Sequence, residues 1–532
     1  MDINCENFEH KKVSSLKEEG VNQIILISEN LKSSYGPLSH DKMILNEYGD
    51  LTITNDGATI FKSIKFSNPL IKIFSDLSLQ QDREIGDGTT GVVIFCSELL
   101  KKALNLIKKK IHPSTIIFSY RLALCYSLSQ VKTLLSKSFI EINLSKIIQI
   151  SKTSLAGKIC NLSISKFSLI CYQAVKSISV FDKDSNRIKC QKNLVTFLKI
   201  QGDSTYRTRL VDGICITDQT AAWDYEEKII SPGRIFCLSR DLQFPKIDLN
   251  YKFIFKKIEK IKDISKSSSK FFSGLIEKLL IYNSNFLITN KNIDNNLANL
   301  LKKNGIISLK RVSDEDFKKI CIFTGCKLKV NLNILEDNSQ YCMGKSEEIF
   351  EQLISNRIIL TIRGCRFCCG NTILIRGPSN YMLDELSRGL WDSICIIKKS
   401  FEGNNFVIGG GSLEIFLSIL LDKFSNLLKS KEELSVLEFS NSLLEIPKIL
   451  FRNSRLDEIN LINKIKTIYN VSLRTKNSSF KDIGVNLKTG FLQNNFEKGI
   501  IEPRTSKLKA FQIATEVVIS LLRIDDIIVN KL

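Results

Sequence analysis

The chain has 532 residues, of which 43% are hydrophobic and 25% charged, and only 8 are Pro. This composition excludes collagen-like, mucin-like and disordered chains and is typical of a folded protein with several domains. Lys and Arg outnumber Asp and Glu by 76 to 56, but they are spread along the whole chain instead of forming one basic block. We therefore expect no nucleic-acid partner, because a nucleic-acid surface gathers basic residues on one face.

Helical periodicity dominates both ends of the chain, and a β-rich segment separates them. The first quarter predicts, in chain order, a helix at 14–34, a hairpin at 43–46 and 51–54, a helix at 69–83, the loop 86–90 and a helix to about 110. The middle and last parts predict short strands alternating with helices such as 314–321, a mobile Lys- and Ser-rich stretch at 256–270, and helices again from about 381, including 413–427 and 507–522. This order predicts a domain inserted into another domain that contains both termini.

Cysteine usage and the N-terminal residues bear on the compartment. The chain has 15 Cys, an odd number, and its first residues lack the basic and then apolar regions of a secretory signal. No apolar run approaches the roughly 18 residues that a membrane helix needs. We expect reduced thiols, a cytoplasmic location and no membrane contact. The 3 His are far apart, which disfavours Ser-His-Asp catalysis and a histidine zinc site.

The loop Gly86-Asp87-Gly88-Thr89-Thr90 lies between two predicted helices and opens the second. Its glycines let the backbone approach a bulky anion, and the Thr hydroxyls and free helix amides can donate hydrogen bonds to phosphate. Asp87 fits such a site if Mg²⁺ bridges its carboxylate and the phosphates. The alternative is a glycine-rich helix cap with an exposed Asp87.

Two further corners precede predicted helices. Asp56, in the turn 54–59, is either a second acidic group of the same site or an N-cap, and taken alone the N-cap is favoured. Gly409-Gly410-Gly411 is either a linker or a flat surface for a purine base. The chain has no Gly-x-x-x-x-Gly-Lys-Ser/Thr sequence, so a nucleotide site here is not a P-loop.

Cys365, Cys368 and Cys369 form a Cys-x-x-Cys-Cys cluster. A structural zinc ion needs four ligands, and the cluster has neither a second pair at close spacing nor a nearby His. We interpret these residues as thiols rather than metal ligands.

Taken in order, several segments resemble the group II chaperonins, the cytosolic CCT/TRiC family. These segments are Gly36-Pro37 with Asp41-Lys42-Met43, Gly49 to Ile60, Gln81 to Thr90, and Gly409-Gly410-Gly411. The resemblance runs from about Leu31 to the C-terminus and is faint in the middle. Within that family the alpha subunits are the most similar, through Lys110 to Ser114, Tyr120 to Ala123, Ala514 to Glu516, and Leu522 to Asp526.

The resemblance implies a multidomain α/β chaperonin protomer. It divides the chain into a mainly helical equatorial domain formed by both chain ends (1–143 and 404–532), a small α/β intermediate domain (144–213 and 372–403) and an α/β apical domain (214–371). The apical domain of this family carries a helical protrusion, and the stretch 256–270 falls within it.

The resemblance also implies an ATPase that uses ATP and Mg²⁺ and couples hydrolysis to protein folding. Asp392 and Asp56 match the family's catalytic carboxylates, with Asp392 orienting the attacking water and Asp56 near the γ-phosphate, and Asp87 matches the Mg²⁺ ligand. The residues that match nucleotide-binding positions are Gly36, Gly88, Thr89, Thr90, Gly91, Lys158, Gly410, Gly411 and Glu502. Phosphoryl transfer needs mainly metal, positioning and an oriented water, which this set can supply.

Several positions depart from the family pattern. Ser39 replaces a glycine, Gly91 replaces a serine, Ala156-Gly157 stand where serines are common, and Ile408 replaces a proline. The carboxylates are present, so we expect hydrolysis to be retained. The apical segment 221–225 does not match closely, and substrate preference is therefore not carried over.

The implied partners are paralogous subunits in a hetero-oligomeric double ring and non-native polypeptides, in a cytosol. The Lys-, Ile- and Asn-rich composition raises the cytosol of a reduced eukaryotic endosymbiont as one option. The alternative function is a structural ring subunit with weak or absent ATPase that mainly contacts substrate and neighbours.

Overall fold

The computed structural model describes most of the chain, with gaps. The described residues are 8–10, 13–45, 49, 51–64, 68–135, 137–138, 144–158, 163–182, 187–190, 194–217, 229–243, 272–277, 279–327, 343–355, 357–365, 370–403, 405–475, 478–524 and 528–530. The predicted mobile stretch 256–270, the apical segment 221–225 and the residues Cys368 and Cys369 lie outside them. Among the described residues, no helix is both long enough and apolar enough to cross a membrane.

The chain forms two compact units, and the first contains both chain ends. Unit 1 comprises residues 1–172, 181–189 and 384–532, and unit 2 comprises 173–180 and 190–383. The helices of unit 1 are α1 (Val13–Lys32), α2 (Gly57–Ser63), α3 (Pro69–Glu84), α4 (Thr89–Lys108), α5 (Pro113–Gln130), α6 (Leu144–Leu155), α12 (Ser412–Leu428), α13 (Glu432–Leu443), α14 (Glu445–Asn453), α15 (Glu458–Thr475) and α16 (Arg504–Arg523). Helices α7 (Ile164–Ile178) and α11 (Asn380–Gly403) each contribute residues to both units.

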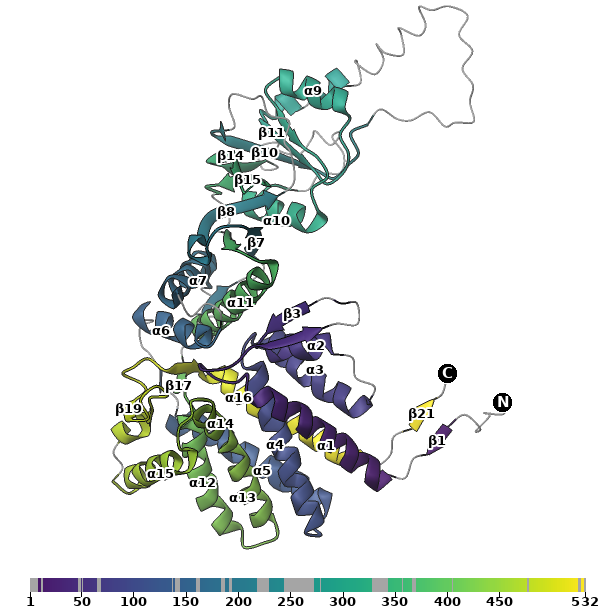
Figure 1. Ribbon diagram of the computed structural model, residues 1–532. Helices are drawn as coiled ribbons and strands as arrows, with labels where there is room; N and C mark the ends of the chain where they lie inside the picture. The colour runs from purple at the N-terminus through teal and green to yellow at the C-terminus, as the bar shows by residue number, and fades with distance from the viewer. Residues whose placement is uncertain are drawn as a thin grey trace, which may run out of the picture. The chain divides into compact units, whose positions relative to one another are not determined.

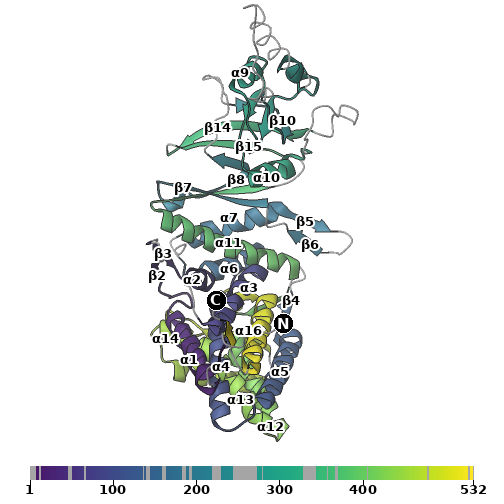
Figure 2. The same cartoon turned by 90° about the vertical axis from the view of Figure 1, so that its right-hand side faces the viewer.

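Helix α4 lies at the centre of unit 1, where it packs against α1, α3, α13 and α16 (Figures 1 and 2). Its side chains are buried on nearly all sides, as expected of a helix that is apolar all round. Phe95 makes edge-to-face contacts with Phe439 and Phe511, at centroid distances of 5.7 and 5.5 Å. Aromatic pairs of this geometry add about 0.5–1.5 kcal/mol each to the burial energy. Phe95 therefore anchors the N-terminal half of α4 to α13 and α16.

Local sequence signals start the neighbouring helices. Asn68 caps α3 by accepting from the amide of Leu70, and Pro69 occupies the first helical position, where its missing N–H costs nothing. Helix α5 begins in the same way, with His112 as N-cap and Pro113 after it. These caps explain why the helix starts are readable from the sequence.

Short strands join the helices of unit 1. In the β2–β3 hairpin, Met43 pairs with Ile53, and in the sheet β20-β17-β4, Val407 pairs with Glu502. The strands are β1 (Phe8–His10), β2 (Lys42–Leu45), β3 (Leu51–Thr54), β4 (Lys137–Ser138), β17 (Asn405–Ile408), β18 (Ile483–Val485), β19 (Leu492–Asn494), β20 (Ile501–Pro503) and β21 (Ile528–Asn530). A further pair joins β5 (Ser179–Asp182) to β6 (Arg187–Cys190).

Unit 2 is built on two sheets. One has the order β7-β16-β8-β15-β14-β9 and the other the order β12-β11-β10-β13. Their strands are β7 (Val195–Gln201), β8 (Arg209–Thr217), β9 (Ile229–Ile230), β10 (Gly233–Leu238), β11 (Phe286–Thr289), β12 (Ile307–Leu309), β13 (Gly344–Ser346), β14 (Glu348–Ile354), β15 (Arg357–Arg363) and β16 (Asn371–Gly377). Helices α9 (Asn295–Lys303) and α10 (Asp314–Thr324) belong to the same unit.

The element predictions agree with the structure at both ends and in the middle. The predicted helices at 14–34, 69–83 and 314–321 correspond to α1, α3 and α10. The predicted hairpin corresponds to β2–β3, and the insertion of a β-rich unit between helical chain ends is confirmed by the two compact units. The fold is mixed α/β, mainly helical, with several small sheets. The division into three domains stays a prediction.

Candidate functional site

A cavity of about 570 Å³ lies within unit 1. Residues from both chain ends line it, although they are hundreds of positions apart in the sequence. All of the predicted site residues are among the lining residues: Gly36, Asp56, Asp87, Gly88, Thr89, Thr90, Gly91, Lys158, Asp392, Gly410, Gly411 and Glu502. A cavity of a few hundred cubic ångström fits a ligand of nucleotide size.

Two helix N-termini open into this cavity, and both have glycine as N-cap. Gly88 precedes α4 with φ of 79°, and Gly411 precedes α12 with φ of 80°. Glycine has no side-chain oxygen to accept from the first-turn amides, so these amides remain available to a ligand. Because the helix dipole also places partial positive charge there, the two ends form a site for anions.

Gly86 is required by close packing. It has φ of 83°, and a Cβ at this position would lie 2.6 Å from Cβ of Cys395 on α11. The loop before α4 therefore lies directly against α11, the helix that carries Asp392. The side chain of Gln81 closes the loop by donating to the carbonyl of Asp87 (3.2 Å), while its own buried Oε1 atom has no hydrogen-bond partner in the described structure.

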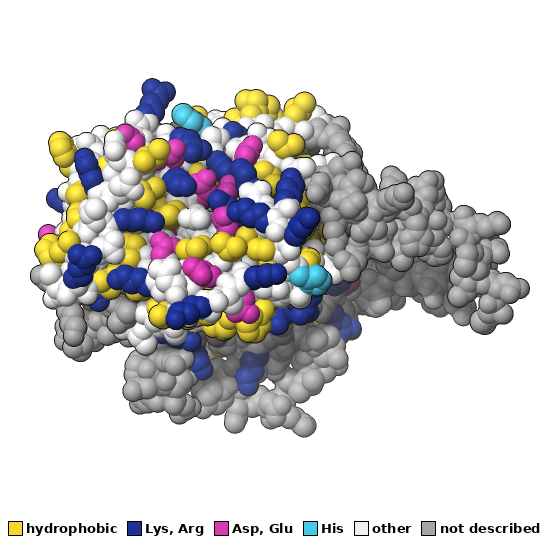
Figure 3. Space-filling view, turned by 90° about the horizontal axis from the view of Figure 1, so that it is seen from below, with side chains coloured by type: hydrophobic (Ala, Val, Ile, Leu, Met, Phe, Trp, Pro, Cys, Tyr) yellow, Lys and Arg dark blue, Asp and Glu magenta, His cyan; other side chains and the backbone are white. Residues whose placement is uncertain are grey.

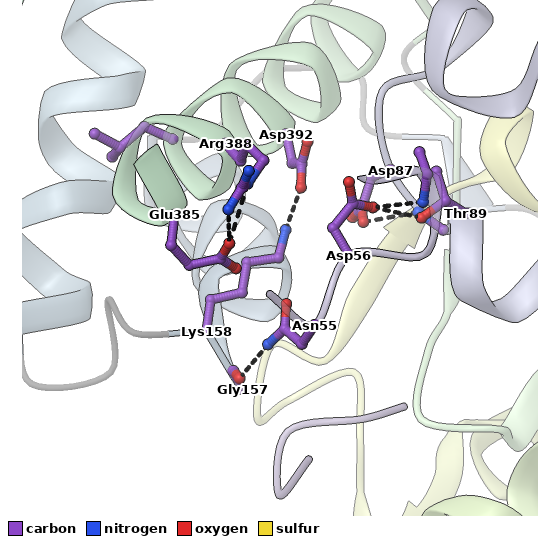
Figure 4. A network of polar contacts seen from close by, with 12 residues as sticks. Asn55, Asp56, Asp87, Thr89, Gly157, Lys158, Glu385, Arg388 and Asp392 are labelled. Atoms are coloured by element: carbon purple, nitrogen blue, oxygen red, sulfur yellow. Dashed lines mark hydrogen bonds and ion pairs between the residues drawn. The ribbon is translucent and has the colours of Figure 1, made fainter. Parts of the chain in front are cut away.

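Asp56 is an N-cap and a cavity residue at once. Its carboxylate accepts from the amides of Ala58 and Thr59 at the start of α2, each at 3.2 Å. It also accepts from Oγ1 of Thr89 at 2.8 Å, which ties α2 to the first turn of α4. Figure 4 shows Asp56 and Asp87 on the same side of the site, next to Thr89. The two readings of Asp56 left open by the sequence are thus compatible.

Asp392 and Lys158 form an ion pair that closes the other side of the site (Figure 4). Burial raises the pKa of the Asp392 carboxyl well above its usual range, and the carboxylates of Asp56 and Asp87 raise it further, while Lys158 offsets part of the effect. Burial alone would lower the pKa of Lys158, but the same three carboxylates together raise it above its ordinary value. The site therefore gathers three acidic side chains around one ammonium group.

Helix α11 is anchored so that Asp392 points toward the cavity. Arg388, one turn before Asp392, donates to the buried carboxylate of Glu385 at 2.6 Å and to the carbonyl of Ile53 on β3 at 3.4 Å. Ser393 is hydrogen-bonded to Ser151 of α6 at 2.7 Å. These contacts hold α11 against the hairpin strand that leads to Asp56 and against the helix that leads to Lys158.

The turn that carries Lys158 lies against the loop at Gly36. Gly157 has φ of 89°, and a Cβ there would lie 2.5 Å from the carbonyl oxygen of Gly36. The Gly157 carbonyl accepts from Nδ2 of Asn55 at 2.9 Å and from Oγ of Ser39 at 3.3 Å. Two of the departures from the family pattern, Ser39 and Gly157, are therefore in contact with each other.

A third cluster lies next to the glycine corner 409–411, and Glu502 is its only member that the sequence indicated. Lys507 on α16 bonds to Glu414 on α12 at 2.8 Å and to Glu502 on β20 at 3.0 Å. A Cβ on Gly91 would meet the ring of Tyr35 at 3.3 Å, so the missing side chain at that position makes room for the tyrosine. In the sequence, the sign of this ion pair was a Lys and a Glu on otherwise apolar helix faces. Without the fold, this pattern is weak evidence that the two side chains meet.

The described residues contain no group of three or more His, Cys, Asp or Glu side chains placed to hold a metal ion by themselves. Cys365 is half-buried, and the rest of its predicted cluster lies outside the described part of the chain.

The chain matches the model of the TCP-1/cpn60 chaperonin family over residues 27–532. It is 34% identical to T-complex protein 1 subunit alpha of Arabidopsis thaliana, over 94% of this chain and 92% of that protein. It is 32% identical to T-complex protein 1 subunit alpha of Tetrahymena pyriformis, over 98% and 96% of the two chains. It is 30% identical to thermosome subunit beta of Archaeoglobus fulgidus, over 95% and 90%.

Proposed function

This chain belongs to the TCP-1/cpn60 chaperonin family, as a group II chaperonin, and on that premise we propose that it is an ATP-hydrolysing subunit of a hetero-oligomeric double ring that folds non-native polypeptides in the cytosol. The equatorial, intermediate and apical boundaries at 143, 213, 371 and 403 are part of this proposal. The similarity to subunits of T-complex protein 1 supports the hetero-oligomeric partners.

One observation carries the proposal: the uncapped N-terminus of α4 and three carboxylates from distant segments line the same cavity. The α4 and α12 amides supply donors for phosphate, and the buried Oε1 of Gln81 is an acceptor that a ligand or its water can satisfy. Gly410 and Gly411 line the cavity and would flank a base and ribose there. The residues present thus fit a nucleoside triphosphate.

The carboxylates suit a metal-assisted transfer. Asp87 lines the cavity beside the α4 N-terminus and would hold Mg²⁺ there, where the ion would neutralise phosphate charge. Asp392 would be the group to orient water and take its proton, because its carboxylate lines the cavity and already accepts a hydrogen bond there from Lys158. Lys158 is bonded to Asp392, and a phosphate at the α4 N-terminus would compete for this ammonium group.

The three cavity carboxylates argue against the alternative function, a structural ring subunit with weak or absent ATPase. Asp56, Asp87 and Asp392 all face one cavity, and the departures at Ser39, Gly91 and Gly157 are accommodated by local contacts. This favours retained hydrolysis. We propose the same ATP-driven cycle for this subunit as for the family, and turnover measured on the ring decides between the two.

The test is Asp392→Ala in the assembled ring, with this chain labelled by a photoreactive ATP analogue and separated from its neighbours before readout. We expect labelling to persist while this subunit's hydrolysis falls by about 10²-fold or more. Glu402→Ala, on the same helix and outside the cavity lining, is the control that should leave hydrolysis unchanged. Unchanged turnover in Asp392→Ala would reject the catalytic assignment, and absence of labelling in the wild-type chain would reject nucleotide binding.

The face shown in Figure 3 offers no argument for a nucleic-acid function among its described residues. On the face shown in Figure 3, Lys and Arg side chains are interspersed with Asp, Glu and hydrophobic side chains instead of forming one block. A steep fall of nucleic-acid affinity with salt, beyond that of an equally basic control protein, would be needed to reopen this possibility.

A further inference from the structure

Three buried cysteines of unit 2 lie together where α10 packs against β10. Cys237 is on β10, Cys321 is on α10, and Cys326 follows directly after the C-cap of that helix. Their exposed fractions are 1%, 7% and 6%. The thiol of Cys237 is hydrogen-bonded to the thiols of both other residues. None of the three lines the proposed nucleotide cavity, so the cluster is separate from that site.

The backbone places these side chains next to one another. Ile235 and Cys237 are two positions apart on β10, so their side chains point to the same face of the sheet. The sulfur of Cys326 lies 3.8 Å from the carbonyl oxygen of Ile235. Gly344 pairs with Ile235 on the neighbouring strand β13, and a Cβ at Gly344 would lie 3.3 Å from Cβ of Cys326. The turn after α10 is therefore seated directly against these strands.

The three thiols differ in how an oxidant can reach them. Hydrogen bonding to Cys321 and Cys326, and then burial, raise the pKa of the Cys237 thiol well above its ordinary value. Cys237 is also the least exposed of the three, so it reacts poorly with a reagent in solution. Cys321 and Cys326 keep a small exposed area, so a small oxidant meets one of them first. Cys237 is then the thiol already in contact with the oxidised sulfur.

We propose that this cluster is an oxidation site, at which a peroxide converts Cys237 and either Cys321 or Cys326 into a disulfide that fastens α10 to β10. In the first step the thiolate of Cys321 or Cys326 attacks one oxygen of hydrogen peroxide, the O–O bond breaks, and a sulfenic acid and water form. In the second step the Cys237 thiol attacks the sulfenic sulfur, the S–O bond breaks, and the hydroxyl leaves as water with the thiol proton.

The balance of this reaction is simple. Two thiols are oxidised to one disulfide, and one hydrogen peroxide is reduced to two water molecules. A small dithiol reverses the reaction by thiol–disulfide exchange, which regenerates both thiols and oxidises the dithiol. This reversibility suits a chain whose thiols are expected to be reduced at rest.

The experiment treats the reduced full chain with stoichiometric hydrogen peroxide, blocks the remaining thiols with N-ethylmaleimide in denaturant, and maps cross-linked peptides by mass spectrometry with fragment sequencing. We expect Cys237 to be joined to Cys321 or to Cys326, and a dithiol to separate them again. Because these sulfurs are already in contact, their cross-linking should exceed that of Cys215 by at least about tenfold.

Cys215 is the matched control. It belongs to the same unit, it is 8% exposed, and burial raises the pKa of its thiol as well. Its sulfur is hydrogen-bonded to the hydroxyl of Thr361 at 3.6 Å instead of to a thiol, so we expect it to be recovered as a free thiol. Cys237→Ala should abolish the cross-link, and so should the double variant Cys321→Ala with Cys326→Ala. Cys215→Ala should leave the cross-link unchanged.

Hydrogen exchange measures whether the disulfide fastens the helix. A cross-link between segments this far apart in the chain restricts the unfolded state of unit 2, so the amides of α10 and β10 should exchange at least about tenfold more slowly after oxidation. The amides of α4 in unit 1 are the reference, and their exchange should not change.

Mapping of the wild-type chain needs no variant, so the test stands even if a variant does not fold. A wild-type chain in which Cys237 stays a thiol while Cys321 or Cys326 is oxidised to a sulfinic acid refutes the oxidation site. A disulfide between Cys321 and Cys326, or a cross-link that persists in Cys237→Ala, refutes it as well. A Cys237 disulfide with unchanged exchange of α10 and β10 refutes the fastening of the helix.

Discussion

Gly157 offers the sharpest test of how this site is assembled, because its neighbours are backbone atoms that cannot turn away. It has φ of 89°, and a Cβ would lie 2.5 Å from the carbonyl oxygen of Gly36 and 3.0 Å from Cα of Pro37. The substitution Gly157→Ala therefore destabilises the fold through two separate effects. The left-handed backbone conformation costs about 1–2 kcal/mol for a residue with a Cβ. The clash requires the two loops to separate by roughly 1 Å, and such overpacking costs about 1–3 kcal/mol more.

A matched control separates the destabilisation caused by the clash from that caused by the left-handed backbone conformation. Gly49 has φ of 85°, and a Cβ there would meet nothing within 4 Å. We expect Gly49→Ala to lower the free energy of unfolding by about 1 kcal/mol and Gly157→Ala by about 3 kcal/mol. Urea unfolding of the full chain measures both. Separation of the loops also moves Lys158 and Gly36, and a displacement of this size is expected to reduce hydrolysis in the ring by about 10²-fold. Equal destabilisation by the two variants would refute the contact between Gly157 and the Gly36 loop as a constraint.

Two further predictions follow from hydrogen bonds of the same unit. Thr89→Val removes the hydroxyl that donates to Asp56 at 2.8 Å. This variant should lower the free energy of unfolding by about 1 kcal/mol and weaken nucleotide labelling. The control is Thr515→Val, whose hydroxyl bonds to a carbonyl of its own helix, and it should leave labelling unchanged. Lys509 bonds to Glu84 and lowers the pKa of that carboxyl, so the pair stabilises the fold above the ordinary Glu pKa and loses its effect as the pH falls through the lowered value. Lys509→Met should therefore flatten the acid side of the stability profile by less than about 1 kcal/mol, and an unchanged profile would show that this exposed pair contributes nothing.

Much of the site was readable from the sequence because it is built from short contiguous segments. The loop 86–90 carries its own geometry: Gly88 adopts a left-handed conformation that favours glycine, and the helix that follows is the buried α4. Asp56 could be assigned as an N-cap from the turn in which it stands. In both cases the determining interactions span a few residues, so local patterns contain them.

The remaining features depend on partners that are far apart in the chain. Lys158 and Asp392 are 234 positions apart, and Lys507 and Glu414 are 93 apart. Nothing in the periodicity of either segment says that these side chains meet, since pairing of this kind depends on how helices pack.

The sequence by itself determined the helix starts, the β-rich insertion, the family and the identity of the acidic and glycine-rich segments. Only the tertiary structure decided that these segments enclose one cavity, that Lys158 is bonded to Asp392, and that Lys507 is bonded to Glu502. The physical reason is that propensity and capping act over one or two turns of chain. Burial, and with it the strength of each charge pair, exists only once distant segments have excluded water from the space between them.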